Sequence, residues 1–425
     1  MNNEKNIVKI IDTSLEYIIA FIIILNTNSV FANLTKIDLH LNVVLIFILS
    51  IYFLRKIIKR DIKTTYLNIK GEISKYYKIF SIYILYLVFF LIFNRNEFKR
   101  FISVFMIIFP LLTYIFINNG GVKIFRKIIN IMFVLATISL IFYLLVSIFR
   151  IIKPTNYVEI EWGGIHNINS FCNIYFETQR FDGLGLHIQR NTGIFVEAPM
   201  YSLCLCIAVA LEEFIVKRRK IIINIILILT IITTFSTTGI ITISYIYILK
   251  IVNKFITKKY INKRKKFIMI FITIILIIIA GIYFIQRIQT SSGSIRLDDY
   301  KASFKAWKDA PLFGNGYQDT DSIKKYMSPF RYYNMGLSNS IMVLLAQCGI
   351  YFSILYIYPF IETIKNLTKK KEYDIIFFET TIILLFITTI FMYKPIMISI
   401  LAFLYSYIIN TNILKEREKY EKVNN

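Results

Sequence analysis

The chain has 425 residues, 56% of them hydrophobic, and its 50 Lys and Arg against 26 Asp and Glu give a formal net charge of +24. The uncharged runs are too long and too numerous for a water-soluble core, so the composition excludes a soluble domain and predicts a multi-pass membrane protein. The basic residues lie in short clusters between the apolar runs. That pattern orients helices in a bilayer, and we therefore exclude nucleic acid as a partner.

Twelve apolar runs are long enough to cross a bilayer if about 20 residues make one crossing. They are residues 15–34, 37–54, 76–93, 101–117, 128–152, 192–216, 221–236, 239–253, 267–285, 337–361, 375–393 and 396–409. The sequence thus predicts an all-α polytopic protein in which residues 1–425 form a single integral membrane domain.

Two of these boundaries depend on local breaks in the apolar pattern. Residues 221–249 would be about 43 Å long as one helix, and a single crossing would separate basic clusters that belong on one side. We therefore predict two short spans joined at the sequence TTFSTTG. Lys394-Pro395 predicts a tight outer turn between the last two spans, because proline interrupts a helix.

Lys and Arg concentrate in alternate connecting segments, which predicts that these segments and both termini are cytoplasmic. The two longest polar segments, residues 153–190 and 286–336, then form two large extracytoplasmic loops. We predict that both loops face the outside of a bacterial cytoplasmic membrane and build one site there.

A group of charged residues lies where the first large loop enters the membrane. Arg190, Gly193 and Glu197 are spaced i, i+3 and i+7, so on a helix they would share one face, with Gly193 leaving room for a ligand. Charges at this depth are costly and often mark a substrate path. The structural alternative is that Arg190 extends to lipid headgroups while Glu197 pairs with another helix.

The second loop predicts a helix along the membrane surface that ends before Pro311. Ser294 can cap it, and Asp298 and Asp299 in its first turn suit the positive end of the helix dipole. One face of this helix aligns Arg296, Tyr300, Ser303 and Trp307. Since amphipathic surface helices are common structural features, this alignment alone does not assign a function.

Two further groups of residues are candidates for a metal site or for a general base. Asp319-Thr320-Asp321 matches a D-x-D metal motif, but two aspartates beside a glycine turn are more often turn formers. His187 and His166 lie in the first loop, where a histidine is either solvated or a candidate base. The sequence contains no ligand cluster for a metal, and we predict neither a metal nor another cofactor.

Three segments, in this order, resemble the superfamily of O-antigen polymerases and O-antigen ligases. "RNTGIFVEAP" resembles the signature R-x-x-G-x-F-x-E-P, with Ala198 inserted before the proline. "SGSIRLDDYKASFKAWKDAPLFGNGY" is similar to a segment with an arginine, a helix with Trp, and P-L-x-G-x-G. "LSNSIMVLLAQCGIYF" resembles the entry into the next span, where Asn339 and Gly349 match and Ser338 replaces a histidine of the ligase branch.

This resemblance implies a membrane glycosyltransferase that transfers a glycan from undecaprenyl pyrophosphate to a sugar hydroxyl. The pyrophosphate-binding arginines correspond to Arg190 and Arg296, while no base carries over because Ser338 replaces the histidine. Fixed cations can stabilise the leaving group without a metal. We take Arg190, Arg296 and Glu197 as candidate catalytic residues. The candidate substrate-binding residues are Gly193, Tyr300, Trp307, Asn339 and His187.

Three functions remain open at this point. The first is a polymerase of capsule, exopolysaccharide or O-antigen repeat units, whose partners would be the lipid-linked oligosaccharide, the bilayer, a flippase and a chain-length regulator. The second is a ligase that moves finished glycan to another acceptor. The third is a flippase, which the clustering of ionisable residues at one face disfavours, because transporters carry charges deep in discontinuous helices.

Overall fold

A computed structural model describes residues 2–35, 40–58, 121–162, 164–183, 186–218, 220–257, 291–333, 335–370 and 372–408, with isolated residues between 81 and 88 and between 264 and 285. The helices are α1 (Asn2–Leu25), α2 (Leu41–Ile58), α5 (Val122–Phe142), α6 (Ala198–Ala210), α7 (Ile221–Thr233), α8 (Thr237–Thr257), α10 (Ser291–Asp309), α11 (Asp321–Lys324), α12 (Ser340–Lys370) and α13 (Tyr373–Thr388). A last apolar helix spans Pro395–Ile408. The strands are β1 (Asn156–Glu161), β2 (Ile165–Phe171), β3 (Tyr175–Glu177), β4 (Arg180–Gly183) and β5 (Leu186–Gln189).

The described residues are mostly helical and include four helices long and apolar enough to cross a membrane. These are Val122–Ile148, Ala198–Val216, Thr237–Ile256 and Ser340–Lys370. A helical membrane protein is thereby confirmed, whereas twelve crossings remain a prediction. The predicted spans at 76–93 and 101–117 lie outside the described residues, apart from a few positions, and so does most of 267–285.

The two predicted helix breaks are present. α7 ends at Thr233 and α8 begins at Thr237, so the apolar run 221–249 is two helices and not one. α13 ends at Thr388, and the last helix begins at Pro395 after a turn. Both breaks leave helix-terminal carbonyl groups without an intrahelical donor.

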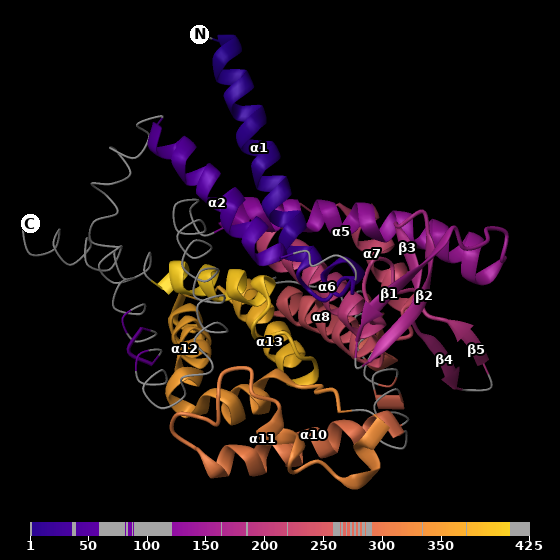
Figure 1. Cartoon of the computed structure of the whole chain (residues 1–425). Coiled ribbons are helices and arrows are strands. Elements are labelled where there is room, and N and C mark those ends of the chain that lie inside the picture. Colours follow the sequence, from indigo (N-terminus) through magenta and orange to yellow (C-terminus); the bar gives the residue numbers. More distant parts are fainter. Residues whose placement is uncertain are drawn as a thin grey trace, which may run out of the picture.

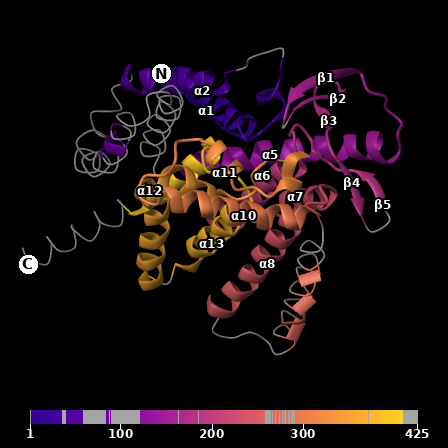
Figure 2. The ribbon, with the colours of Figure 1, turned by 60° about the horizontal axis from the view of Figure 1, so that its bottom comes forward.

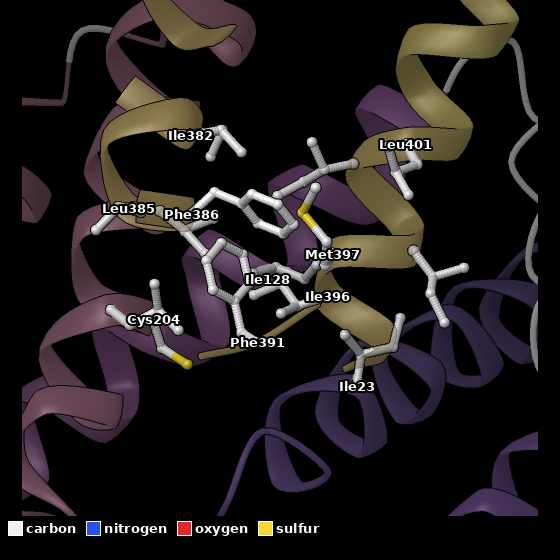
Figure 3. Packing of buried hydrophobic residues seen from close by; sticks show 14 of the residues in the cluster. Ile23, Ile128, Cys204, Ile382, Leu385, Phe386, Phe391, Ile396, Met397 and Leu401 are labelled. Atoms are coloured by element: carbon white, nitrogen blue, oxygen red, sulfur yellow. The ribbon is translucent and has the colours of Figure 1, made fainter. Parts of the chain in front are cut away.

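The helices pack around one apolar core. Figure 3 shows Ile23 of α1, Ile128 of α5 and Cys204 of α6 close to Leu385 of α13 and Met397 of the last helix. Figures 1 and 2 both show α10 and α11 lying across the ends of α12 and α13.

Ion pairs tie several helices together at one end of this bundle. Glu16 of α1 binds Lys127 of α5, and Lys250 of α8 binds Glu213, which follows α6, at 2.6 Å. Further pairs join Asp12 to Arg55, Glu212 to Arg218, and Lys217 to Asp374. Each acid or base has a partner, as charges within an apolar bundle require. α6 begins and α13 ends at the opposite end of the bundle, where a second set of charged residues lies.

The first large loop folds into strands, so the all-α prediction is wrong for this segment. β1, β2 and β3 form an antiparallel sheet in that order, and β4 pairs with β5 as a hairpin. The buried face carries Ile160, Ile168 and Phe176, which pack against Val30 and Val196. β-branched and aromatic residues at alternating positions favour strands, and this period of two distinguishes the loop from the helices around it.

α12 is interrupted at Gly349, where φ is +66°. Residues 311–316 pass so close to this break that backbones bond directly: the amides of Ile350 and Tyr351 donate to the carbonyls of Pro311 and Leu312 at 2.9 and 3.0 Å. In return, the amide of Gly316 donates to the carbonyl of Gln347 at 2.9 Å. The glycines of P-L-x-G-x-G are thus explained by the close approach of two backbones.

We expect Gly349→Ala to lower the thermal unfolding midpoint in detergent. A Cβ there would lie 2.4 Å from the Leu312 carbonyl oxygen and would also require a positive φ, a strain of about 1–3 kcal/mol. Gly281→Ala is the matched control, because a Cβ at Gly281 meets nothing within 4 Å. Equal midpoints for the two variants would contradict this account of the break.

Candidate active site

The segment from Arg190 to Glu197 is extended and turned, so the prediction that these residues share a helical face is wrong. α6 begins at Ala198, and Glu197 precedes it with φ −129° and ψ 137°. Pro199 favours a helix that starts here, because proline suits the first turn of a helix and has no amide to donate to the Phe195 carbonyl if the helix began earlier. The segment also pairs with the chain after α1, where the Val30 amide donates to the Ile194 carbonyl and the Val196 amide to the Asn28 carbonyl, at 2.9 and 3.1 Å.

Arg190 is held at the break between α7 and α8. Its Nε donates to the Thr234 carbonyl at 2.8 Å and one terminal nitrogen donates to the Phe235 carbonyl at 3.3 Å. The other terminal nitrogen donates to Gln179 Oε1 at 3.4 Å. These carbonyls are unpaired because α7 ends there, and its negative dipole end attracts a cation. Burial lowers the pKa of Arg190 to about 10, so the side chain remains protonated at neutral pH.

Gly193 makes room for a protein side chain. Its φ is +53°, and a Cβ would lie 3.0 Å from the ring of Tyr201 in α6. The space that the sequence assigned to a ligand is therefore filled by Tyr201, whose hydroxyl lies 2.7 Å from Ser139 Oγ.

Glu197 accepts hydrogen bonds through one carboxylate oxygen. Trp162 Nε1 donates to its Oε1 at 2.7 Å, and Asn28 Nδ2 donates to the same atom at 3.3 Å. Trp162 follows β1 and Asn28 follows α1, so both donors come from outside α6. The second oxygen, Oε2, receives no hydrogen bond from a described residue.

Arg296 reaches the same region from α10. Its Nη1 donates to the Thr388 carbonyl at 2.5 Å, and Tyr300 one turn later donates to the Ile387 carbonyl. These carbonyls end α13, so Arg296 is held by a helix terminus in the same way as Arg190. Ser294, expected to cap α10, lies inside the helix because α10 already starts at Ser291.

Charged groups converge on Glu197 from three separate segments. The charges of Arg190, Arg296 and Lys394 all act on this carboxylate, and Arg190 and Arg296 also repel one another. Burial raises the pKa of Glu197, whereas Trp162 and the three cations lower it. Burial lowers the pKa values of Arg296 and Lys394. Within the described residues none of these cations forms a close ion pair, so the cluster (Arg190, Glu197, Arg296 and Lys394) carries an excess of positive charge.

The family comparison locates part of this cluster. Residues 222–357 match a family model described as O-antigen ligase. This part of the chain is thus similar to the O-antigen ligase family. A search of curated proteins finds no significant match. The match confirms the resemblance to the O-antigen polymerase and ligase superfamily that the three motifs indicate.

The matched region, residues 222–357, includes Arg296 and the carbonyl groups that hold Arg190. Arg190 and Glu197 themselves precede the matched region, and Lys394 follows it. The complete cluster therefore depends on how flanking segments fold back onto this region.

A second charged group in the matched region is fully paired. Arg331 is buried and donates to Asp299 at 2.7 Å and to Asp298 at 3.4 Å. Ser338 Oγ donates to the other oxygen of Asp299. Burial raises the pKa of Asp299, while Ser338 and Arg331 lower it. Ser338 is thus bonded to a carboxylate. Asp298 and Asp299 lie beyond the first turn of α10, which starts at Ser291, so the prediction that they are first-turn acids is wrong and they serve as ion-pair partners of Arg331.

The other predicted binding residues have contacts within the protein. Trp307 Nε1 donates to the Pro311 carbonyl at 3.1 Å, and Asn339 Oδ1 caps α12 by accepting from Met342 N at 3.0 Å. His187 is exposed beside Asp182 in the β4–β5 hairpin, with 2.6 Å between Nδ1 and Oδ1. The groups that act on Glu197 are Trp162, Arg190, Arg296 and Lys394, so the structure does not bring these three residues into the cluster.

The D-x-D sequence forms a turn. Asp319 accepts hydrogen bonds from the backbone amides of Asp321 and Ser322 at 2.9 and 3.3 Å, while Asp321 pairs with Lys324 at 2.8 Å. Among the described residues, no three His, Cys, Asp or Glu side chains gather as a metal-binding group.

Sequence reasoning missed Trp162, Asn28 and Lys394. A tryptophan after an alternating strand and a lysine before Pro395 are both visible in the sequence. Neither pattern predicts that the tryptophan bonds to Glu197 or that the charge of the lysine acts on it. Lys394 lies 197 positions after Glu197 in the chain, so only the packing of the helices brings its charge near that carboxylate.

Proposed function

We propose that this protein is a polysaccharide polymerase of capsule, exopolysaccharide or O-antigen repeat units. It transfers glycan from undecaprenyl pyrophosphate to a sugar hydroxyl of another lipid-linked repeat unit, on the outer face of the cytoplasmic membrane. The observation that supports the proposal is the excess of buried positive charge around Glu197, supplied by Arg190, Arg296 and Lys394.

The reaction requires a stabilised leaving group. The acceptor oxygen bonds to the anomeric carbon while the bond from that carbon to the pyrophosphate oxygen breaks, and its electron pair leaves with the pyrophosphate. Arg190 and Arg296 are already oriented by carbonyl groups, so little reorganisation is needed when negative charge develops nearby. A guanidinium has five donors, and each arginine retains some for a pyrophosphate.

Glu197 suits the role of general base for the acceptor hydroxyl. Trp162 and Asn28 hold Oε1, which leaves Oε2 to take the proton. A raised pKa makes the carboxylate a stronger base, and positioned bases typically contribute about 10²–10⁴-fold in rate. Glu197 thus fills the role for which the sequence offers no histidine at Ser338.

Ligase activity is the second candidate, because the matching family model is described as O-antigen ligase. A ligase would use the same leaving group and the same base but a different acceptor. Product analysis separates the two.

Labelling of Cys172 tests the orientation of the first loop. Cys172 is exposed, whereas Cys204, Cys206 and Cys348 are buried. An impermeant thiol reagent should therefore label the wild-type protein on intact cells and should fail to label Cys172→Ser. In that background, Lys370→Cys at the exposed end of α12 should react only after permeabilisation. The reverse pattern would place the cluster in the cytoplasm and overturn the proposed reaction.

Substitution of Arg190 tests leaving-group stabilisation. We expect Arg190→Ala to reduce the transfer rate about 10²-fold or more. Arg190→Lys should also be impaired, because one ammonium cannot replace a guanidinium that binds Thr234, Phe235 and Gln179. Arg180→Ala is the control, since that arginine is 55% exposed in β4.

The assay for these variants supplies purified protein with synthetic undecaprenyl-pyrophosphate repeat units. A polymerase that works without a metal should build a ladder of products in the presence of a chelator. Loss of the ladder with chelator would reject metal independence, and single transfer to a different acceptor would identify a ligase. Full activity of Arg190→Ala at normal protein levels would reject the role of the cluster.

The pH dependence tests Glu197 as the base. A base acts when it is deprotonated, so the rate should fall as the pH drops through a Glu197 pKa that lies above its ordinary value of 4.5. The Trp162 hydrogen bond lowers this pKa, and Trp162→Phe should therefore move the acid limb of the rate profile to higher pH. Tyr157→Phe, at a residue of β1 that is 73% exposed, should leave the profile unchanged. An acid limb that does not move in Trp162→Phe would contradict the assignment.

A further inference from the structure

Lys394 lies at a turn whose backbone is held from several sides. Ser340 of α12 accepts from the Phe391 amide at 2.9 Å and donates to the Thr389 carbonyl at 2.7 Å. Tyr393 donates to Gln347 Oε1 at 2.8 Å. The Lys394 carbonyl accepts from Met397 and Ile398, which starts the last helix. These hydrogen bonds therefore fix the backbone from which the Lys394 side chain extends.

The same turn adjoins the residues that hold Arg296. Thr388, which accepts from Arg296, ends α13 six positions before Lys394. The turn thus connects the carbonyl that orients Arg296 to a lysine whose charge acts on Glu197. Arg296 and Lys394 consequently approach Glu197 from one side of the bundle, while Arg190 approaches from the α7–α8 break.

Lys394 differs from the two arginines in how its donors are used. Arg190 donates to three protein acceptors and Arg296 to one. The Lys394 ammonium has three donors, and no described residue accepts from them. A partly buried ammonium without an acceptor is costly unless something else supplies one.

We infer that Lys394 is a third binding residue for the pyrophosphate group of the lipid-linked donor, contacting it directly through its ammonium. This inference rests on the proposed function and adds a residue that lies outside the matched family region. The alternative role is indirect, in which Lys394 only keeps Glu197 ionised. The two roles differ in whether the anion itself binds more weakly when the lysine is removed.

Inorganic pyrophosphate provides a binding probe that does not depend on turnover. The chain has two tryptophans, so Trp307→Phe leaves Trp162, which is bonded to Glu197, as the reporter of binding at the cluster. In this background we expect Lys394→Gln to weaken pyrophosphate binding roughly tenfold, as loss of a charge-assisted contact does. Lys394→Arg should retain most of the affinity. Lys305→Gln, an exposed lysine of α10, should bind like the parent.

The outcomes separate this inference from the proposed function. If Arg190→Ala loses affinity but Lys394→Gln does not, Lys394 does not contact the anion and the inference is wrong while the proposed function stands. If Arg190→Ala also binds pyrophosphate as tightly as the parent, the cluster is not a pyrophosphate site and both fail. Thermal unfolding of each variant checks that lost binding does not reflect lost folding.

Discussion

The arrangement of this protein depends on the partly buried carboxylate of Glu197. A charge in such a place must be hydrogen-bonded and balanced, or folding would neutralise it. Trp162 and Asn28 supply the hydrogen bonds from the sheet and from the segment after α1, and Arg190, Arg296 and Lys394 supply the balancing charge. Because the three cations outnumber the carboxylate, the arrangement that stabilises Glu197 also leaves a net positive charge, which is the basis of the anion site that we propose.

Helix ends explain how Arg190 and Arg296 can be held in place without being neutralised by a carboxylate. Arg190 binds carbonyls after α7, and Arg296 binds a carbonyl at the end of α13. A carbonyl orients a guanidinium through the helix dipole but carries no full negative charge, so the cation stays available to a ligand. A carboxylate partner would have cancelled it, as happens at the other end of the bundle, where Lys250 pairs with Glu213.

The second loop is positioned by contact between backbones. Residues 311–316 bond to α12 where Gly349 interrupts it, which fixes the end of α10 relative to the membrane helices. Arg331 holds the first half of α10 through Ile295, Asp298 and Asp299. With both ends held, α10 can present Arg296 to Thr388 with little freedom. The polar loop is therefore a rigid part of the site.

The sequence alone determined the class of protein, the break between α7 and α8, the turn before Pro395 and the helix ending before Pro311. These follow from hydrophobic runs, proline and glycine placement, and local motifs, all of which act over a few residues. The roles of Arg190 and Arg296 stay a prediction. Tertiary structure decided that Arg190 to Glu197 is extended, that Gly193 accommodates Tyr201, that the first loop is a sheet, and that Trp162 and Lys394 meet at Glu197. Such contacts join positions up to 197 residues apart, and no local pattern encodes them, because they arise when separate helices and strands bury their apolar faces against one another.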